Sequence, residues 1–349
     1  MTKIRQIFLQ IPSLKRKWEQ FLHQQGLTSF SEAEVTNLDF TLGLYEGQKL
    51  LGTGSISDNV LKFIAVIPGE LSATYFNQIV SALQSYLVQN GQTHMMVFTK
   101  PQYEASFNYV GFKTLTKTIQ GCLLESGNPG IQQYFKNLPN VSNQNQHQVA
   151  AVVVNANPFT MGHRYLIEKA AQENEIVDVF VLSANHSLFT SDERFHLVKL
   201  GVADFKNVRV FPGGSYLVSY ATFPAYFIVS KDNVIRYQTT LDAQLFRDQI
   251  APVLNIKRRY LGDEPFSHTT NIYNQTLKAV LPPKIQVVII PRLQQGNQIV
   301  TATAVRQAIA HQEITMVKDF LPEITYQFIQ DHQSELLERI RKGVNIGGN

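Results

Sequence analysis

The stretch that decides the fold lies near the middle of the chain and reads Val152-Val153-Val154-Asn155-Ala156-Asn157-Pro158-Phe159-Thr160-Met161-Gly162-His163-Arg164-Tyr165-Leu166-Ile167. Its β-branched run predicts a buried strand, because such residues favour strands and a turn signal ends the run. Asn157-Pro158 predicts that turn, and Thr160 is a suitable cap for a following helix. The stretch therefore predicts a strand, a tight turn and a helix whose first turn carries Gly162 and His163.

The start of this predicted helix suits a phosphate. A helix N-terminus presents unpaired N–H groups and a partial positive charge. Gly162 lets the backbone approach a ligand closely, and His163 supplies a donor to a phosphate oxygen. The alternative interpretation is an ordinary strand, turn and helix that carries a surface histidine.

Length and composition describe a folded protein of moderate charge. With 349 residues the chain exceeds what one core usually organises, so two domains are expected. A hydrophobic content of 44% and a charged content of 17% are typical of a globular protein. The net charge of +4, with a pI near 8.9, favours acidic ligands such as nucleotides or an acidic protein partner, and is too weak to argue for nucleic-acid binding. The tight basic clusters, Lys15-Arg16-Lys17 and Lys257-Arg258-Arg259, are expected to be solvated faces.

The sequence predicts neither export nor membrane insertion. It has no run of about 18 apolar residues, and Met1-Thr2-Lys3-Ile4-Arg5 has no apolar segment behind its charges. The single cysteine, Cys122, cannot form an intrachain disulfide framework and fits a reducing cytoplasm. Its apolar neighbours predict a buried, inert thiol. We therefore expect a cytoplasmic protein with no membrane partner.

The second half of the chain predicts a parallel sheet. Predicted strands at 149–155, 176–183, 208–211 and 285–290 alternate with predicted helices at 162–174, 191–202 and 303–311. Alternating strands and helices indicate right-handed crossovers, and ligands bind such sheets at the carboxyl ends of the strands. We therefore expect a Rossmann-like, doubly wound α/β domain. Residues 323–341 predict one amphipathic helix that packs on this domain.

The first half predicts an α+β domain. Its elements are a helix at 14–25, paired strands at 40–45 and 50–56, a strand at 61–67, a helix at 72–89, a strand at 95–99 and a further strand after 107–112. A polar stretch then predicts a linker. The expected domains are 1–140 and 149–349, joined by the linker 141–148.

The first half resembles the acyltransferase fold of the GNAT superfamily. Asn108-Tyr109-Val110-Gly111-Phe112 is similar to that superfamily's YxxxGF ending. The loop that binds the acyl-CoA pyrophosphate there is Gln/Arg-x-x-Gly-x-Gly/Ala, whereas Pro68-Gly69-Glu70-Leu71-Ser72-Ala73 stands in its place and keeps one glycine. A structural or partner-docking domain is the expectation, and an active acetyltransferase is the alternative.

Two motifs resemble the nucleotidyltransferase superfamily, which cleaves ATP between its α and β phosphates. Thr160-Met161-Gly162-His163 resembles its (T/H)xGH signature, and Ile299-Val300-Thr301-Ala302-Thr303-Ala304-Val305-Arg306 resembles its ISxSxxR signature. Two hydroxyls and an arginine at a helix start can hold the β and γ phosphates. A plain helix cap is the alternative for the second motif alone.

Further segments resemble the same superfamily. Phe189-Thr190-Ser191-Asp192-Glu193-Arg194 is similar to its FSxxER helix start, where Ser191 or Asp192 is the expected cap. Arg194 is expected near the nucleotide, with a surface ion pair as the alternative. Two longer blocks follow, at 216–227 and at 261–274, and the second contains Asp263 and Glu264.

Together these blocks resemble the [citrate (pro-3S)-lyase] ligase family over most of the chain. The resemblance implies that ATP and acetate are used to acetylate the thiol of a CoA-derived group on the citrate lyase acyl carrier subunit. Acetyl-AMP would form, and AMP and pyrophosphate would be released. Mg²⁺ is expected as a bridge between phosphates, with no protein metal site.

The resemblance also implies roles for individual residues. His163, Thr160 and Arg306 are the expected catalytic residues. The expected nucleotide-binding residues are Asn157, Pro158, Phe159, Gly162, Arg194, Asp263, Glu264, Thr301 and Thr303. Asp263 and Glu264 would orient the ribose, the adenine or Mg²⁺, or else form a purely structural turn.

Three other functions stay open at the level of sequence. The first is an adenylyltransferase that joins ATP to phosphopantetheine or a mononucleotide. The second is an N-terminal acetyltransferase whose C-terminal domain senses a nucleotide. The third is a scaffold that binds the carrier without catalysis.

Overall fold

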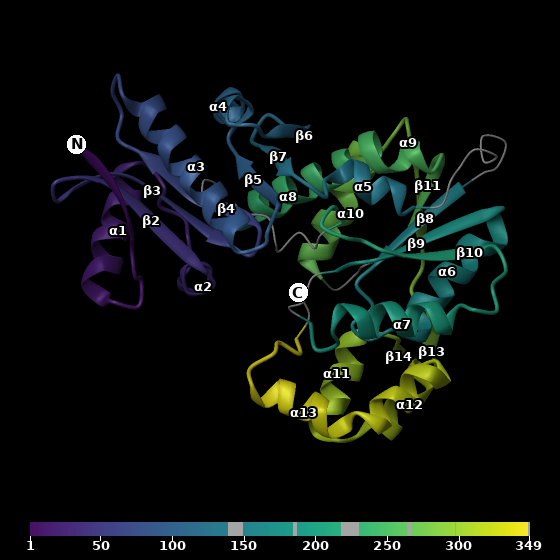
Figure 1. The fold of residues 1–349 in the computed structure, drawn as a ribbon. Coiled ribbons are helices and arrows are strands. Elements are labelled where there is room, and N and C mark those ends of the chain that lie inside the picture. Colours follow the sequence, from purple (N-terminus) through teal and green to yellow (C-terminus); the bar gives the residue numbers. More distant parts are fainter. Residues whose placement is uncertain (139–148, 184–186, 218–229, 264–266, 297, 348–349) are drawn as a thin grey trace. The chain divides into compact units, whose positions relative to one another are not determined.

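The computed structural model describes residues 1–138, 149–183, 187–217, 230–263, 267–296 and 298–347 (Figure 1). The chain forms two compact units, one of Met1–Tyr134 with Phe223–Leu241 and one of Phe135–Thr222 with Asp242–Asn349. One boundary along the chain cannot separate these units, because residues 230–241 belong to the N-terminal unit although they follow part of the C-terminal unit in the sequence. The linker predicted at 141–148 lies outside the described residues.

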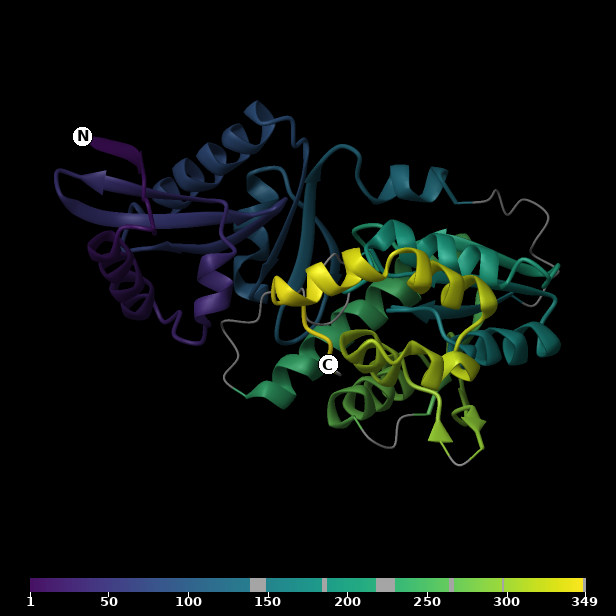
Figure 2. The same cartoon turned by 90° about the horizontal axis from the view of Figure 1, so that it is seen from below.

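The N-terminal unit is built on a seven-stranded mixed sheet with the order β1-β2-β3-β4-β5-β7-β6. Its strands and helices make up the purple and blue part of the ribbon (Figure 2). Its strands are β1 (Thr2–Gln6), β2 (Phe40–Glu46), β3 (Lys49–Ser57), β4 (Val60–Val66), β5 (His94–Thr99), β6 (Lys113–Lys117) and β7 (Cys122–Gly127). Its helices are α1 (Pro12–Gln24), α2 (Glu32–Thr36), α3 (Ser72–Gln89), η1 (Pro101–Tyr103), α4 (Glu104–Tyr109) and α5 (Ile131–Lys136), the last of which crosses the boundary of the unit. Adjacent strands are antiparallel except β4 and β5, which are parallel. The hairpin predicted from residues 40–56 is thereby confirmed.

Helices α1 and α3, predicted at 14–25 and 72–89, each pack apolar side chains on the sheet. Trp18 is fully buried, donates from Nε1 to Thr53 Oγ1 at 3.0 Å and meets the ring of Phe63 edge-on. Helix α3 lies close to β3, because a Cβ at Gly52 would come within 2.5 Å of Ile79 Cδ1. Cys122 is also buried, and burial raises the pKa of its thiol to about 11, which confirms the inert thiol.

The C-terminal unit is built on a five-stranded, all-parallel sheet with the order β10-β9-β8-β11-β12. Its strands are β8 (Val149–Val154), β9 (Ile176–Val181), β10 (Val208–Pro212), β11 (Ile256–Gly262) and β12 (Gln286–Ile290), with a small hairpin of β13 (Gln294–Gln295) and β14 (Gln298–Ile299). Its helices are α6 (Met161–Glu173), α7 (Ser191–Gly201), the end of α8 (Lys231–Leu245), η4 (Phe246–Ile250), α9 (Ala251–Val253), α10 (His268–Val280), α11 (Ala302–His311), η5 (Ile314–Phe320), α12 (Glu323–Asp331) and α13 (Gln333–Arg341). The predicted α/β fold class, with a parallel C-terminal sheet and a mixed N-terminal unit, is confirmed.

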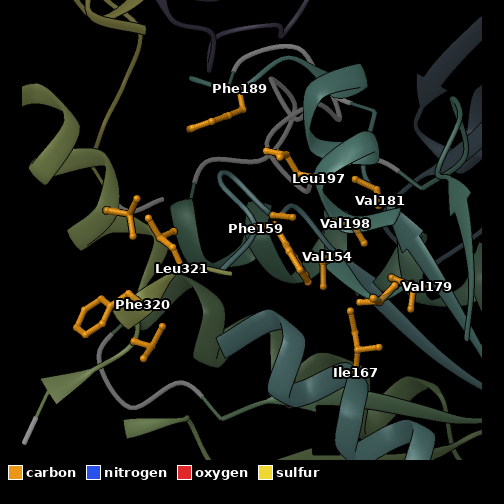
Figure 3. Close-up of a cluster of buried hydrophobic side chains, with 14 of the residues drawn as sticks. Val154, Phe159, Ile167, Val179, Val181, Phe189, Leu197, Val198, Phe320 and Leu321 are labelled. Carbon is orange, nitrogen blue, oxygen red and sulfur yellow. The ribbon is translucent and has the colours of Figure 1, made fainter. Parts of the chain in front are cut away.

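The core of the C-terminal unit joins the sheet to the helices around it. It contains Val154, Phe159 and Leu197, and it reaches Phe320 and Leu321 after α11 (Figure 3). Helices α6 and α7 lie on one face of the sheet, with α11 to α13 beyond α7 (Figure 1). The core therefore fixes the start of α6 relative to the C-terminal helices.

The predicted single helix at 323–341 is wrong in one respect. Two helices, α12 and α13, meet at His332, whose φ of −112° and ψ of 19° are not helical. The His332 ring stacks on Phe328, with centroids 4.1 Å apart. Arg339 of α13 pairs with Glu193 of α7 at 2.7 Å, so the second helix is held against the unit as expected.

The expected solvated face at Lys257-Arg258-Arg259 is wrong for Arg259, which is 0% exposed. This residue lies in β11, between β8 and β12. Its guanidinium lies 4.4 Å from the centroid of Phe246, and Nη2 donates to Tyr273 Oη at 3.0 Å. Partners distant in sequence therefore bury a charge that the local pattern assigns to the surface.

None of the helices within the described residues is both long and apolar enough to cross a membrane.

Candidate functional site

The site is built on the turn that follows β8. Ala156 has a φ of +50°, a conformation that side-chain-bearing residues seldom adopt and that is common at functional turns. Asn157 is 8% exposed, and its Oδ1 accepts a hydrogen bond from Phe189 N at 3.1 Å. Asn157 thus orders the turn that Asn157-Pro158 predicts.

Thr160 and His163 are locked together at the start of α6. Thr160 is the N-cap, as predicted: its Oγ1 accepts from His163 N. In return, Thr160 N donates to His163 Nδ1 at 3.1 Å. A ring nitrogen that accepts a backbone hydrogen bond carries no proton, so the proton of neutral His163 is on Nε2.

His163 is neutral at physiological pH. Burial, together with the charges of Arg292 and Arg306, lowers the pKa of His163 from 6.5 to about 4. The side chain can therefore donate one hydrogen bond from Nε2 without carrying charge, while the two arginines supply positive charge.

The second phosphate motif starts α11 and lies against α6. Thr301 is the N-cap, and its Oγ1 accepts from Ala304 N at 3.1 Å. An oxygen that accepts in this way still carries an O–H donor, so capping is compatible with donation to a phosphate. A Cβ built on Gly162 would lie 3.4 Å from Val300 O, which places the starts of the two helices in contact.

Arg306 connects the two motifs. Its Nη1 donates to Asn157 O at 2.6 Å, across 149 positions of the chain, and its Nη2 donates to Thr303 Oγ1 at 3.0 Å. The C-terminal tail supplies two more acceptors, Ile346 O for Nε and Gly347 O for Nη2. The structure thus brings the predicted catalytic residues together, and the C-terminal tail is hydrogen-bonded to Arg306.

Arg194 and Phe159 occupy the core, which differs from the nucleotide contacts expected for them. Arg194 is 0% exposed, and Nη1 donates to Asn155 O at 2.8 Å and to Leu182 O at 2.7 Å, which also excludes a surface ion pair. It therefore ties the ends of β8 and β9 together. Phe159 is fully buried and packs closely on Gly201 of α7.

The remaining predicted residues are the cap of α7, Pro158, Asp263 and Glu264. The cap of α7 is Thr190, which forms a capping box with Glu193, so the predicted cap at Ser191 or Asp192 is wrong by one or two positions. Pro158 is buried in the turn. Asp263 follows β11 and is exposed, and its backbone carbonyl accepts from Arg292 Nε at 2.8 Å. Glu264 lies outside the described residues.

Arg292 is the site residue that sequence reasoning missed. Its signal was its position, two residues after the last strand of the parallel sheet, where ligand-binding residues concentrate. Within the part of the chain that the structure describes, no group of three or more His, Cys, Asp or Glu residues gathers in a way that could hold a metal ion.

Comparison with known proteins agrees with this architecture. The family model described as "Citrate lyase ligase C-terminal domain" matches residues 149–329. The chain is 31% identical over 331 residues to [Citrate [pro-3S]-lyase] ligase of Escherichia coli (strain K12), covering 93% of this chain and 91% of that protein. It is 28% identical over 148 residues to phosphopantetheine adenylyltransferase of Corynebacterium diphtheriae, covering 39% of this chain and 92% of that protein.

The comparison with solved structures gives weaker matches. An N-acyl amino acid synthase from uncultured soil microbes matches with a TM-score of 0.33 and 13% identity, covering 38% of this chain and 94% of that one. The family is established by the sequence match over 93% of the chain and by the family model that matches residues 149–329. The chain belongs to the [citrate (pro-3S)-lyase] ligase family.

Proposed function

We propose that this enzyme activates citrate lyase by acetylating the thiol of the CoA-derived group on its acyl carrier subunit, with ATP and acetate as co-substrates. The proposal joins the family of the chain to the geometry of its C-terminal unit. The observation that carries it is the hydrogen bond from Arg306 to Asn157 O, because it unites two phosphate-binding motifs in one site.

The first step joins acetate to AMP. An acetate oxygen attacks the α-phosphorus of ATP, the bond to the β-phosphate oxygen breaks, and pyrophosphate leaves. Negative charge accumulates on the phosphoryl oxygens, so catalysis depends on positioning and charge stabilisation. The Nε2–H of His163 and the N-terminal amides of α6 would hold the α and β phosphates, with Thr160 fixing the imidazole.

Arg306 and the hydroxyls of Thr301 and Thr303 would hold the leaving pyrophosphate. A guanidinium fork matches two phosphate oxygens, and two hydroxyls add donors beside it. Mg²⁺, when bound to the nucleotide, would supply positive charge that neutralises the phosphates, consistent with its preference for phosphate and water oxygens. Asn157 would keep the turn in place for the incoming acetate.

The second step transfers the acetyl group. The carrier thiolate attacks the carbonyl carbon of acetyl-AMP, a thioester forms, and AMP leaves with the electron pair of the broken C–O bond. This route needs no covalent enzyme nucleophile. Docking of the carrier's prosthetic arm is the role proposed for the N-terminal unit, and Asp263 and Glu264 are proposed near the ribose or adenine.

The test is direct transfer to the carrier. Purified chain, ATP, Mg²⁺ and isotopically labelled acetate are incubated with deacetylated carrier subunit, and the mass of the prosthetic group is measured. The proposal predicts a labelled thioester that hydroxylamine removes. Unmodified carrier, with ATP intact, would refute it.

A second candidate is a phosphopantetheine-type adenylyltransferase, favoured by the similarity of part of the chain to such an enzyme. It predicts a stable dinucleotide product from ATP and a phosphorylated substrate, with no acetate requirement. Product analysis with acetate omitted distinguishes the two reactions.

A further inference from the structure

Arg292 lies where the parallel sheet presents ligands. Strand β12 ends at Ile290, whose neighbour in β11 is Gly262, and Arg292 follows two positions later. Its Nε donates to Asp263 O at 2.8 Å, which anchors the side chain at the carboxyl end of β11, the strand beside β8. The side chain is half-buried, so it is held by the protein and still reaches solvent.

A second set of contacts links Arg292 to the start of α6. The next residue, Leu293, accepts through its carbonyl a hydrogen bond from Val300 N at 3.1 Å. Val300 O in turn faces Gly162. Arg292 therefore stands at the base of the β13–β14 hairpin, and it is this base, through Val300, that contacts the helix carrying His163. The positive charge of Arg292 acts on that imidazole.

The site needs positive charge beyond what the two motifs provide. His163 is neutral, so it contributes a donor without charge. Arg306 already makes four hydrogen bonds to protein oxygens, two of them to the tail. A triphosphate and an attacking carboxylate are both anions, so a protein cation beside them, in addition to Mg²⁺ on the phosphates, would lower their mutual repulsion.

We propose that Arg292 is a substrate-binding residue whose guanidinium holds an anionic oxygen beside His163. The oxygen belongs either to the phosphate chain of ATP or to the carboxylate that attacks it. The identity of these substrates rests on the proposed function, whereas the anion-binding role of Arg292 does not.

The test compares Arg292→Gln and Arg292→Lys with a matched control, Arg247→Gln. Arg247 lies in the same unit and also donates to a backbone carbonyl, Val280 O at 2.7 Å, but it belongs to η4 and pairs with Asp248 at 2.6 Å, outside both motifs. Calorimetric binding of ATP and of inorganic pyrophosphate is measured for the full chain, followed by the KM for acetate in acetate-dependent ATP–pyrophosphate exchange.

For Arg292→Gln we expect either an affinity for ATP and pyrophosphate at least tenfold lower or a KM for acetate at least tenfold higher. Arg292→Lys should recover part of the loss, and Arg247→Gln should behave as the wild type does. Weaker binding of ATP or pyrophosphate identifies a phosphate oxygen, whereas a raised KM for acetate with unchanged ATP binding identifies the carboxylate. Unchanged binding and unchanged KM, with only a lowered Tm, would overturn the proposal and leave Arg292 a clamp on Asp263.

The two proposals fail in different ways. If the wild-type chain shows no acetate-dependent exchange, the proposed function is wrong. The binding of ATP and pyrophosphate to Arg292→Gln then decides the role of Arg292 alone, and wild-type affinity there would overturn it.

Discussion

His163 is the residue on which the chemistry of the site depends most. Its Nδ1 accepts from the backbone of Thr160, which leaves Nε2 as a donor of fixed direction. The sequence predicted the residue and its helix position, because the turn signal, cap and glycine are local. It could not predict the protonation state, because that depends on burial and on the charges of Arg292 and Arg306, which lie far along the chain.

Replacing His163 with alanine should lower the rate of acetyl-AMP formation by roughly 10²–10³-fold, the scale for losing one transition-state donor. The measurement is ATP–pyrophosphate exchange at saturating acetate. His196→Ala, which removes an exposed histidine of α7, is the control and should keep the wild-type rate. A near wild-type rate for His163→Ala would remove this side chain from the mechanism.

The low pKa of His163 should make stability depend on pH. The unfolded chain takes up the proton near pH 6.5 and the folded chain near pH 4, so between these values the unfolded state binds more protons. The free energy of unfolding should therefore fall as pH falls through this window. Urea unfolding at pH 7 and pH 5 measures the loss.

The His163→Gln variant isolates this contribution. Burial raises the pKa of Asp178 and of Asp242 to about 6, and these carboxyls act in the opposite direction in both proteins. The variant should thus lose less stability between pH 7 and pH 5 than the wild type does. Equal losses would contradict a neutral, partly buried imidazole.

Gly162 offers a test in which stability and binding should change in opposite directions. A Cβ there would make only ordinary contacts with Val300 O and Thr160 Oγ1, so the fold has room for alanine. Alanine also favours helix over glycine, by roughly 0.5–1 kcal/mol. We expect Gly162→Ala to keep or raise the Tm, and to raise the KM for ATP about tenfold, because the new methyl group meets the phosphates. An unchanged KM would mean that the helix start does not touch the nucleotide.

At the scale of elements, local patterns predicted those strands and helices that carry their own signals. Strand β8, helix α6 and helix α11 were predicted to within a residue or two of their bounds. Strand β11 was missed, because Lys257-Arg258-Arg259 is typical of a surface and its burial depends on Phe246 and Tyr273. The break at His332 was missed for a similar reason, since the amphipathic pattern continues through it.

The tail after α13 supplies two acceptors to Arg306, so we expect it to compete with a ligand for this side chain. Deleting 346–349 removes the carbonyls of Ile346 and Gly347 and frees two donor directions of the guanidinium. We expect the KM for ATP to fall by roughly 3–10-fold, about 1 kcal/mol of binding. The Tm should fall as well, because Ile346 packs against the core.

The control for this truncation is the deletion of 348–349 alone, which leaves both carbonyls in place. It should behave as the wild type does. A raised KM for ATP after deletion of 346–349 would show instead that the tail helps to hold the nucleotide.

At the scale of the whole molecule, the two units are interleaved along the chain. The sequence predicted one linker and two consecutive domains, because the polar stretch before β8 is a strong local signal. It could not reveal that 230–241 return to the first unit, since that depends on packing. A Cβ at Gly121, for example, would come within 2.4 Å of the Tyr237 hydroxyl.

This arrangement predicts that a fragment of residues 149–349 aggregates when it is produced alone. Tyr237 and Leu241 are buried in the full chain, and the fragment would lack the strands of the N-terminal unit. Size-exclusion chromatography with light scattering should show aggregates of the fragment. Co-expression with residues 1–138 should reduce this aggregation. A monodisperse fragment with the same Tm as the full chain would contradict the assignment of 230–241 to the first unit.

The most direct test of the central claim is ATP–pyrophosphate exchange by the purified chain with Mg²⁺, measured with and without acetate. Acyl-adenylate chemistry predicts exchange that requires acetate and that His163→Ala reduces, while the carrier subunit is absent. A lack of exchange with acetate, unrelieved by deacetylated carrier, would contradict the account and favour the adenylyltransferase.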